Sequence, residues 1–234
     1  MQRNDKKKIA IAIDGPAASG KSTTAKLVAQ KLGYLHIDTG AMYRALTLKV
    51  IENNLDPCDE VKIVALARAS NIRLEGGDST TRVLLDDVNI TDRIRTPEVN
   101  KAVSTVSSYK GVRDVMVREQ QRMSADGGVV LEGRDIGTVV LPLADLKIFM
   151  IASVEERVKR RKKDLALSGI EADETELVKD IEARDRKDST REVSPLKKAS
   201  DAVELDTSDL TIDEQVDFIV ALAKKKISES EVVV

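Results

Sequence analysis

The segment from Ile9 to Leu32 constrains the fold of this chain more than any other. An aliphatic run over residues 9–13 has strand character, a glycine-framed turn over residues 15–23 follows, and residues 24–32 continue with helical spacing. In this order of elements the glycines direct backbone amides toward an anion at the N-terminus of the helix. The segment therefore predicts a site for a polyphosphate.

The turn contains the full pattern G-x4-G-K-S, which is specific in a strand–loop–helix context. In such a turn the lysine, here Lys21, reaches the β- and γ-phosphates of ATP, and the serine hydroxyl, here Ser22, is placed to ligate Mg²⁺. We therefore expect ATP as co-substrate, Mg²⁺ as cofactor and Ser22 as the metal ligand. The residues expected to bind ATP in this turn are Gly15, Pro16, Ala17, Ala18, Ser19, Gly20, Lys21, Ser22 and Thr23.

Several aliphatic runs alternate with helical segments along the whole chain, which is typical of a parallel sheet with helices on both faces. The five predicted strands span residues 8–14, 34–37, 128–131, 146–151 and 202–205. Ligands of such α/β sheets bind beyond the carboxyl ends of the strands. Polar residues follow each predicted strand, so the topology is expected to gather them at one edge.

Between the second and third predicted strands lies a long stretch with a separate strand pattern. Residues 72–75, 82–86 and 87–90 alternate in a strand-like way around the turn at residues 76–78. We interpret residues 56 to 96 as a small β-containing insert. The sequence leaves open whether this insert is a decorative subdomain or a clamp on the substrate.

Basic residues crowd one helical stretch between Glu155 and Ile170. Most basic runs are solvated helix faces, and that explanation remains open here. After a strand of a phosphate-binding fold, the same arginines could close over ATP, neutralise the transferring phosphoryl group and exclude water. On this second interpretation, Arg157 and Arg161 are further ATP-binding residues.

Composition limits the class of protein. The net charge of −2 argues against a general nucleic-acid or membrane-surface binder, so we expect neither partner. The single cysteine, Cys58, and the lack of a long apolar run favour a cytoplasmic protein. We expect a last helix over residues 212–226 and disordered ends at residues 1–8 and 229–234.

Three further motifs follow the turn, at residues 38–44 (DTGAMYR), 132–140 (EGRDIGTVV) and 184–191 (RDRKDSTR). Together they resemble the motifs of bacterial cytidylate kinases, the CMP/dCMP kinases of the P-loop nucleoside monophosphate kinase group. The resemblance runs from Ile9 to about Lys226. It implies a monomeric α/β P-loop kinase with a five-stranded parallel sheet, and a single domain over residues 9–228. Within that domain it implies a nucleoside monophosphate-binding insert at residues 56–100 and a lid at residues 155–171.

The same resemblance implies roles for individual residues. In the family, three arginines hold the acceptor phosphate, and they correspond to Arg44, Arg134 and Arg184. Planar guanidinium groups suit a phosphate dianion, although any one of them could instead form a surface salt bridge. Thr39 lies beside the first arginine and keeps the hydroxyl of the family's Ser or Thr. The residues expected to take part in catalysis are Lys21, Arg134, Asp135 and Arg184.

For the acceptor's base, the resemblance implies Ser104, Arg113 and Asp135. A carboxylate can accept from the amino group of cytosine, while the arginine and the serine donate to the ring acceptors. Uracil would place O4 against the carboxylate, and an unpaired buried group of this kind costs about 1 to 3 kcal/mol. The resemblance thus implies phosphorylation of CMP and dCMP in preference to UMP. Asp188 and Arg191 are implied near the ribose and phosphates, although an intrahelical ion pair would also explain their spacing.

Other functions remain open at this point. A different small-molecule kinase of the same class would act on AMP, UMP, dTMP or a metabolite such as shikimate. A nucleotide switch or motor would hydrolyse NTP without an acceptor, but the guanine-specific N-K-x-D motif is absent from the sequence. A nucleic-acid binder would use the basic run 157–163. His36 is imaginable as a base, but packing within its strand is the expected role, because phosphoryl transfer depends more on positioning and charge neutralisation.

Overall fold

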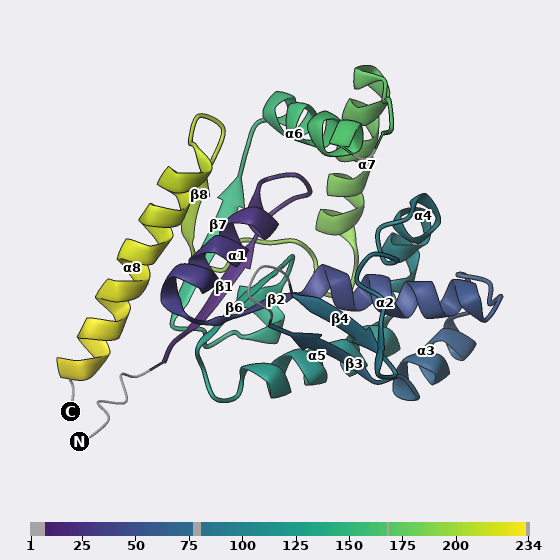
Figure 1. Cartoon of the computed structure of the whole chain (residues 1–234), viewed down its shortest axis with the longest axis horizontal. Helices are drawn as coiled ribbons and strands as arrows, with labels where there is room; N and C mark the ends of the chain where they lie inside the picture. The colour runs from purple at the N-terminus through teal and green to yellow at the C-terminus, as the bar shows by residue number, and fades with distance from the viewer. Residues whose placement is uncertain (1–7, 77–80, 168, 233–234) are drawn as a thin grey trace. The chain divides into compact units, whose positions relative to one another are not determined.

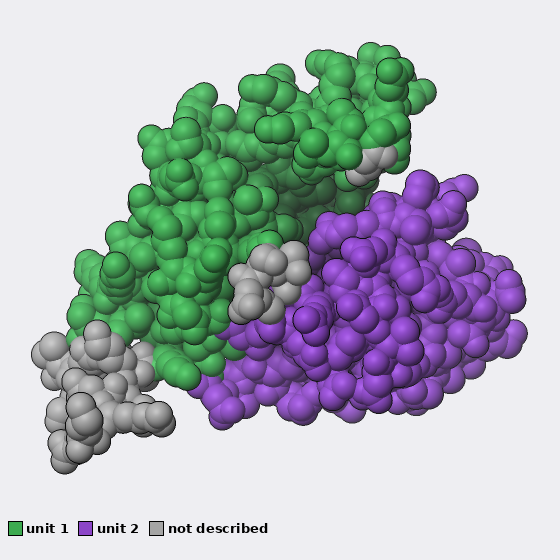
Figure 2. Space-filling view, in the orientation of Figure 1, with its two compact units in different colours: residues 1–34, 127–234 green, residues 35–126 purple. Residues whose placement is uncertain are grey.

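The computed structural model describes residues 8–76, 81–167 and 169–232, with side chains to residue 229. The chain divides into two compact units, which Figure 2 colours separately. Unit 1 contains residues 1–34 and 127–234, and unit 2 contains residues 35–126. Among the described residues, no helix is long and apolar enough to cross a bilayer.

A five-stranded sheet has the strand order β2-β6-β1-β7-β8 (Figure 1). Its strands are β1 (Ala10–Asp14), β2 (Leu35–Asp38), β6 (Val129–Gly133), β7 (Leu146–Ile151) and β8 (Val203–Asp206). The pairs β1–β6, β1–β7 and β7–β8 are parallel, with Ile13 opposite Glu132 on one side and Ile148 on the other. The predicted α/β class, a parallel sheet flanked by helices, is confirmed, and every predicted core strand overlaps an observed one.

The core of unit 1 explains why β1 is almost entirely aliphatic. Ile9, Ile11 and Ile13 are buried in one cluster with residues of α1 (Lys21–Leu32) and α8 (Ile212–Val232). A central strand of a parallel sheet is buried on both faces, so a continuous apolar run stabilises it better than alternation would. This packing fixes the end of β1, where the turn of residues 15–20 begins.

The helices α6 (Val154–Leu167) and α7 (Glu174–Thr190) follow β7 and have a small apolar cluster of their own. Val158, Leu177 and Ile181 are its buried members. The basic segment predicted as a lid at residues 155–171 therefore contains one helix of a packed pair. Residue 168 lies outside the described residues, and closure of this segment on a nucleotide remains a prediction.

The described residues of unit 2 include four helices and a three-stranded sheet of order β3-β4-β5. The helices are α2 (Thr39–Glu52), α3 (Glu60–Arg68), α4 (Pro97–Val106) and α5 (Lys110–Ser124), and the strands are β3 (Ile72–Glu75), β4 (Arg82–Leu85) and β5 (Val88–Asn89). The strands predicted within residues 72–90 are confirmed, and part of the turn predicted at 76–78 lies outside the described residues. The compact unit is wider than the predicted insert, because α2 and α5 flank residues 56–100 in sequence and pack in the same unit.

The C-terminal helix is longer than the sequence pattern suggested. α8 continues to Val232, so the prediction of a disordered end from residue 229 is wrong up to that residue. Lys225 and Glu229 lie 3.9 Å apart at i,i+4 spacing on this stretch, but both side chains are exposed, so the pair contributes little stability. Residues 1–7 and 233–234 lie outside the described residues, and Lys8 lies within them.

Candidate functional site

Two glycines shape the turn between β1 and α1. A Cβ on Gly15 would lie 2.1 Å from the Met150 carbonyl oxygen, so no larger residue fits there. Gly20 caps α1 with φ of 92°, a left-handed conformation that glycine adopts without strain. The turn therefore leads into the N-terminus of a 12-residue helix, the arrangement that binds phosphate groups.

Lys21 is buried at the first position of α1. Its ammonium group donates to the Pro16 carbonyl oxygen at 2.5 Å and lies 3.3 Å from the Ser19 hydroxyl. Burial, and next the positive charge of Arg134, lower the pKa of Lys21 to about 7, while Glu132 and Asp14 act in the opposite direction. An anion bound in the turn would offset this burial and favour the charged ammonium.

Ser22 and Glu132 together offer oxygen atoms suited to Mg²⁺. The Ser22 hydroxyl donates to the Glu132 carboxylate at 2.7 Å, and Glu132 is buried in β6. A hydroxyl and a carboxylate are the hard oxygen donors that Mg²⁺ prefers. Among the described residues, no group of three or more acidic, His or Cys side chains could hold a metal alone. The donor set therefore fits an ion that takes its other ligands from phosphate and water.

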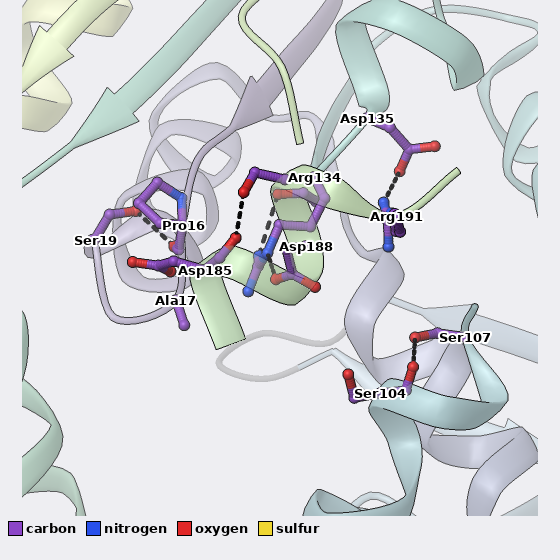
Figure 3. A network of polar contacts seen from close by, with 12 residues as sticks. Pro16, Ala17, Ser19, Ser104, Ser107, Arg134, Asp135, Asp185, Asp188 and Arg191 are labelled. Carbon is purple, nitrogen blue, oxygen red and sulfur yellow. Dashed lines mark hydrogen bonds and ion pairs between the residues drawn. The ribbon is translucent and has the colours of Figure 1, made fainter. Parts of the chain in front are cut away.

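A cluster of charged side chains follows β6 in unit 1. Arg134 Nε donates to Asp188 at 2.8 Å, and Arg191 lies 3.6 Å from the Asp135 carboxylate (Figure 3). Asp135 and Asp188 are buried. Arg184 contributes to the electrostatics of both Lys21 and Asp188. Unit 1 thus gathers five of the predicted site residues near the turn: Arg134, Asp135, Arg184, Asp188 and Arg191.

Asp188 is the negative centre of this cluster. Burial acts to raise the pKa of its carboxyl, but the charges of Arg134, Arg184 and Arg191 together with the hydrogen bond from Arg134 lower it below the usual range. The hydrogen bond from Arg134 to Asp188 joins two different motifs. The carboxylate holds a guanidinium of the loop that follows β6.

Helix α6 contacts the turn through Arg157 and the loop after β8 through Arg160. Arg157 is buried, donates to the Ala17 carbonyl at 3.3 Å and forms an ion pair with Asp185 at 2.6 Å. Arg160 donates to the Thr207 hydroxyl at 3.0 Å and to the Thr207 carbonyl at 2.6 Å. Arg161, the other predicted ATP-binding arginine of this helix, is half-buried. The solvated-face explanation therefore fails for Arg157.

In unit 2, the motif at residues 38–44 forms the start of α2. The Asp38 carboxylate accepts from the Ala41 amide at 3.0 Å and pairs with Arg95 at 3.2 Å. A Cβ on Gly40 would lie 2.9 Å from Arg44 Nη1, which places that guanidinium over the first turn of the helix. Thr39 is buried at the start of the same turn.

Arg113, on α5, is buried against the ring of Tyr43 in unit 2. Its guanidinium carbon lies 5.4 Å from the ring centroid, and Nη1 donates to the Ser107 carbonyl at 3.3 Å. The Ser107 hydroxyl in turn donates to the Ser104 carbonyl at 3.4 Å (Figure 3). Unit 2 therefore brings Arg113 and the Ser104 segment of α4 into one network, with Tyr43 supplying a cation–π contact.

The sequence patterns gave no individual role to Asp14, Glu132, Tyr43 or Thr207. Asp14, Glu132 and Thr207 lie at strand ends, which was the available signal. Tyr43 lies within the motif at residues 38–44, but its contact with Arg113 is long-range and leaves no local pattern. His36 lies in β2, half-buried, with Nδ1 3.4 Å from the Thr81 hydroxyl. This environment agrees with packing within the strand.

Comparison with known proteins identifies the family. The family model described as Cytidylate kinase matches residues 11–225. The chain is 51% identical to a cytidylate kinase of Listeria innocua over 94% of this chain and 98% of that one. It is 47% identical to a cytidylate kinase of Bacillus subtilis over 94% of this chain and 98% of that one.

A solved shikimate kinase from Acinetobacter baumannii aligns over 94% of this chain and 95% of its own, with 15% identity and a TM-score of 0.46. The sequence matches span nearly the whole chain and include the turn and all three later motifs. The chain therefore belongs to the cytidylate kinase family and is a nucleoside monophosphate kinase.

Proposed function

We propose that the protein transfers the γ-phosphoryl group of ATP to the 5′-phosphate of CMP or dCMP, giving CDP or dCDP. Family membership supports CMP and ATP as the substrates. The observation that carries the proposal is the convergence of Arg134 and Arg184 on the electrostatic environment of Lys21 in unit 1. Positive charge near Lys21 would help to neutralise a transferring phosphoryl group.

The transfer is proposed to be direct and in line. Phosphoryl transfer proceeds through a loose transition state whose charge is spread over the equatorial oxygens, so positioning and charge neutralisation supply most of the rate. The turn amides and Lys21 are proposed to hold the triphosphate, and Arg44, Arg134 and Arg184 to hold the acceptor phosphate. Mg²⁺, held by Ser22 with Glu132 nearby, would neutralise charge on the phosphate oxygens when bound.

The arginines of α6 are proposed to complete the donor site. Arg157 already lies against the Ala17 carbonyl of the turn, and Arg161 is on the same helix. Guanidinium groups near the phosphates would stabilise the transition state and keep water from acting as acceptor. Closure of this helix segment, residues 155–171, and of the insert, residues 56–100, is part of the proposal.

For the base, Asp135 is proposed to accept from the cytosine amine, and Arg113 and Ser104 to donate to the ring acceptors. The stacking of Arg113 on Tyr43 supports this, because it fixes the guanidinium plane before a ligand arrives. Asp188 and Arg191 are proposed to act at the ribose and phosphates. A cytoplasmic monomer remains the expectation, and the free, exposed Cys58 suits a reducing compartment.

A coupled ADP-release assay tests the proposal with CMP, dCMP, UMP, AMP, dTMP and shikimate as acceptors. We expect CMP and dCMP to be used with kcat/KM about 10- to 100-fold above UMP. Hydrolysis of ATP without an acceptor should be slow, and omission of Mg²⁺ should abolish turnover. Equal rates with UMP and CMP would contradict the role of Asp135, and turnover of another acceptor without CMP would overturn the function.

The variant Asp135→Asn tests the role of Asp135 in base recognition with the same assay. Its amide can donate to uracil O4, so the ratio of kcat/KM for CMP to that for UMP is expected to fall by about tenfold or more. Asp145→Asn, an exposed carboxylate elsewhere in unit 1, is the matched control and should leave the ratio unchanged. An unchanged ratio in Asp135→Asn would assign base recognition to other residues.

A further inference from the structure

Asp14, the last residue of β1, has a contact that the proposed chemistry does not use. Its side chain is buried, and each carboxylate oxygen accepts one backbone amide: Oδ1 from Ile136 and Oδ2 from Gly137, both at 2.8 Å. A buried carboxylate is unfavourable unless it is fully hydrogen-bonded. Two short, charge-assisted bonds to adjacent amides are a specific compensation for that burial.

The two amides belong to the start of a π-helical turn, η1 (Ile136–Val140). Val139 and Val140 donate to the Asp135 carbonyl at 2.9 and 3.2 Å, and Leu141 donates to the Ile136 carbonyl at 2.7 Å. The first amides of a helix have no carbonyl partner within it and need an acceptor from elsewhere. Asp14 supplies that acceptor from a strand more than 120 residues earlier in the chain.

The residues directly before these amides are Arg134 and Asp135, for which we propose phosphate and cytosine contacts. Asp135 has φ of −143° and ψ of 25°, so the backbone turns at this residue between β6 and η1. Arg134 is held by Asp188, and Asp135 lies near Arg191. Asp14 bonds the amides of the two residues that follow Arg134 and Asp135 in sequence. These bonds hold the backbone on the C-terminal side of Arg134 and Asp135.

We propose that Asp14 is a positioning residue for the acceptor nucleotide. By accepting hydrogen bonds from the Ile136 and Gly137 amides, it fixes the backbone conformation that places the Arg134 and Asp135 side chains. This inference rests on the proposed function. Because β1 also leads into the turn around Lys21, one strand end would fix both the phosphate turn and the acceptor loop. A displacement of about 1 Å in such a loop can reduce turnover about 100-fold.

The variant Asp14→Asn tests the inference. Asparagine has nearly the same shape, but it can accept only one of the two amides and turns an NH₂ group toward the other. We expect KM for CMP to rise about 10- to 100-fold in the folded enzyme, with KM for ATP changed less than threefold. A role limited to stability would instead lower kcat with the unfolded fraction and leave both KM values unchanged, which would overturn the inference.

Asp145→Asn is the matched control. Asp145 Oδ2 accepts the Ala10 amide at 2.8 Å, so this exposed carboxylate bonds a backbone amide at the other end of the same strand. We expect both KM values to stay within twofold of the wild type. If the wild-type enzyme leaves CMP unphosphorylated, the proposed function fails; if it phosphorylates CMP and the two variants behave alike, only the role of Asp14 fails.

A measurement on the wild-type protein keeps the inference testable should Asp14→Asn not fold. The amide signals of Ile136 and Gly137 can be followed by NMR while CMP is added without ATP. We expect both signals to move in step with CMP saturation, because the loop that they anchor contacts the ligand. Signals that stay in place at full saturation would overturn the inference.

Discussion

Asp14 and Asp188 show how similar side chains in one unit meet opposite electrostatic conditions. The pKa of Asp14 is raised to about 6, mainly by burial and also by the charge of Asp135, while the Gly137 and Ile136 amides and Lys21 act to lower it. Asp188 is also buried, yet the arginines around it lower its pKa. The number of guanidinium groups nearby decides the direction, so the two carboxylates contribute to stability in opposite pH ranges.

Asp188→Asn should destabilise the ligand-free protein by about 3 kcal/mol at pH 7, because it leaves the Arg134 charge half-buried without its partner. A lowered folded-state pKa gives stability above the unfolded value of 3.8 that is lost as the pH falls through the folded value. The difference in the free energy of unfolding between wild type and variant should therefore shrink below about pH 4. Urea denaturation at several pH values measures it.

Asp217→Asn is the control for that experiment. Asp217 pairs with Lys31 at 2.7 Å, but both side chains are exposed. The variant should therefore lower the free energy of unfolding by no more than about 1 kcal/mol. If the difference in the free energy of unfolding between wild type and Asp188→Asn does not change with pH, the carboxylate charge is not what stabilises the cluster.

For Asp14 the sign is reversed. A folded-state pKa of about 6 against an unfolded value of 3.8 means that stability from this group is full below pH 3.8 and is lost as the pH rises through 6. The shift corresponds to about 3 kcal/mol between those limits. Relative to Asp14→Asn, the wild-type free energy of unfolding should therefore fall from pH 4 to pH 7. A relative rise over that range would contradict the burial argument.

At the scale of elements, α6 and α7 form a pair whose packing is separate from the main cluster of unit 1. The pair has a small apolar cluster, and it contacts the turn through Arg157 and the loop after β8 through Arg160. An element with few buried apolar contacts opens more easily than the central sheet. This local weakness suits a segment that we propose to move over a bound nucleotide.

Leu177→Ala should weaken this pair selectively. Removal of a buried leucine side chain costs about 2 to 5 kcal/mol. Hydrogen exchange should therefore quicken at the amides of α6 and α7, while the amides of β1 and β6 keep their protection. Leu167→Ala is the control, because that leucine is 81% exposed. It should leave the hydrogen-exchange rates of α6 and α7 nearly unchanged. Equal loss of protection in the central strands would show that the pair is not a separate cooperative element.

At the scale of the whole molecule, unit 1 is built from two distant parts of the chain. β1 comes from the first part and lies between β6 and β7, which come from the second. Ile148 on β7 pairs with Ile13 on one side and with Val203 on the other. The centre of the sheet thus depends on contacts that form only after the intervening chain has been closed into a loop.

Ile148→Ala should destabilise unit 1 by about 2 to 5 kcal/mol, because Ile148 is buried in the main cluster and its truncation leaves a cavity. Val203→Ala on the neighbouring strand removes a side chain that is 36% exposed and should cost no more than about 1 kcal/mol. Urea denaturation followed by far-UV circular dichroism measures the free energy of unfolding of both variants. An equal decrease in the two variants would contradict the assignment of Ile148 to the core.

Local patterns were sufficient to predict the strands, the phosphate turn and the motifs that mark the family. The reason is that strand and helix periodicity and the glycine turn act over a few residues, and the run 9–32 contains the whole strand–loop–helix signal. The same local reasoning failed at the C-terminus, where α8 continues to Val232, beyond the apolar pattern that predicted its end.

Only the tertiary structure decided which partners the polar residues have. Ser22 meets Glu132 across 110 residues of sequence, and Asp14 reaches the amides of Ile136 and Gly137 across more than 120. Such pairs follow from the order of strands in the sheet, which no local pattern records. The sequence by itself therefore determined what kinds of side chain stand at each strand end. The packing determined which of them are buried together, and thus which charges hold one another in place.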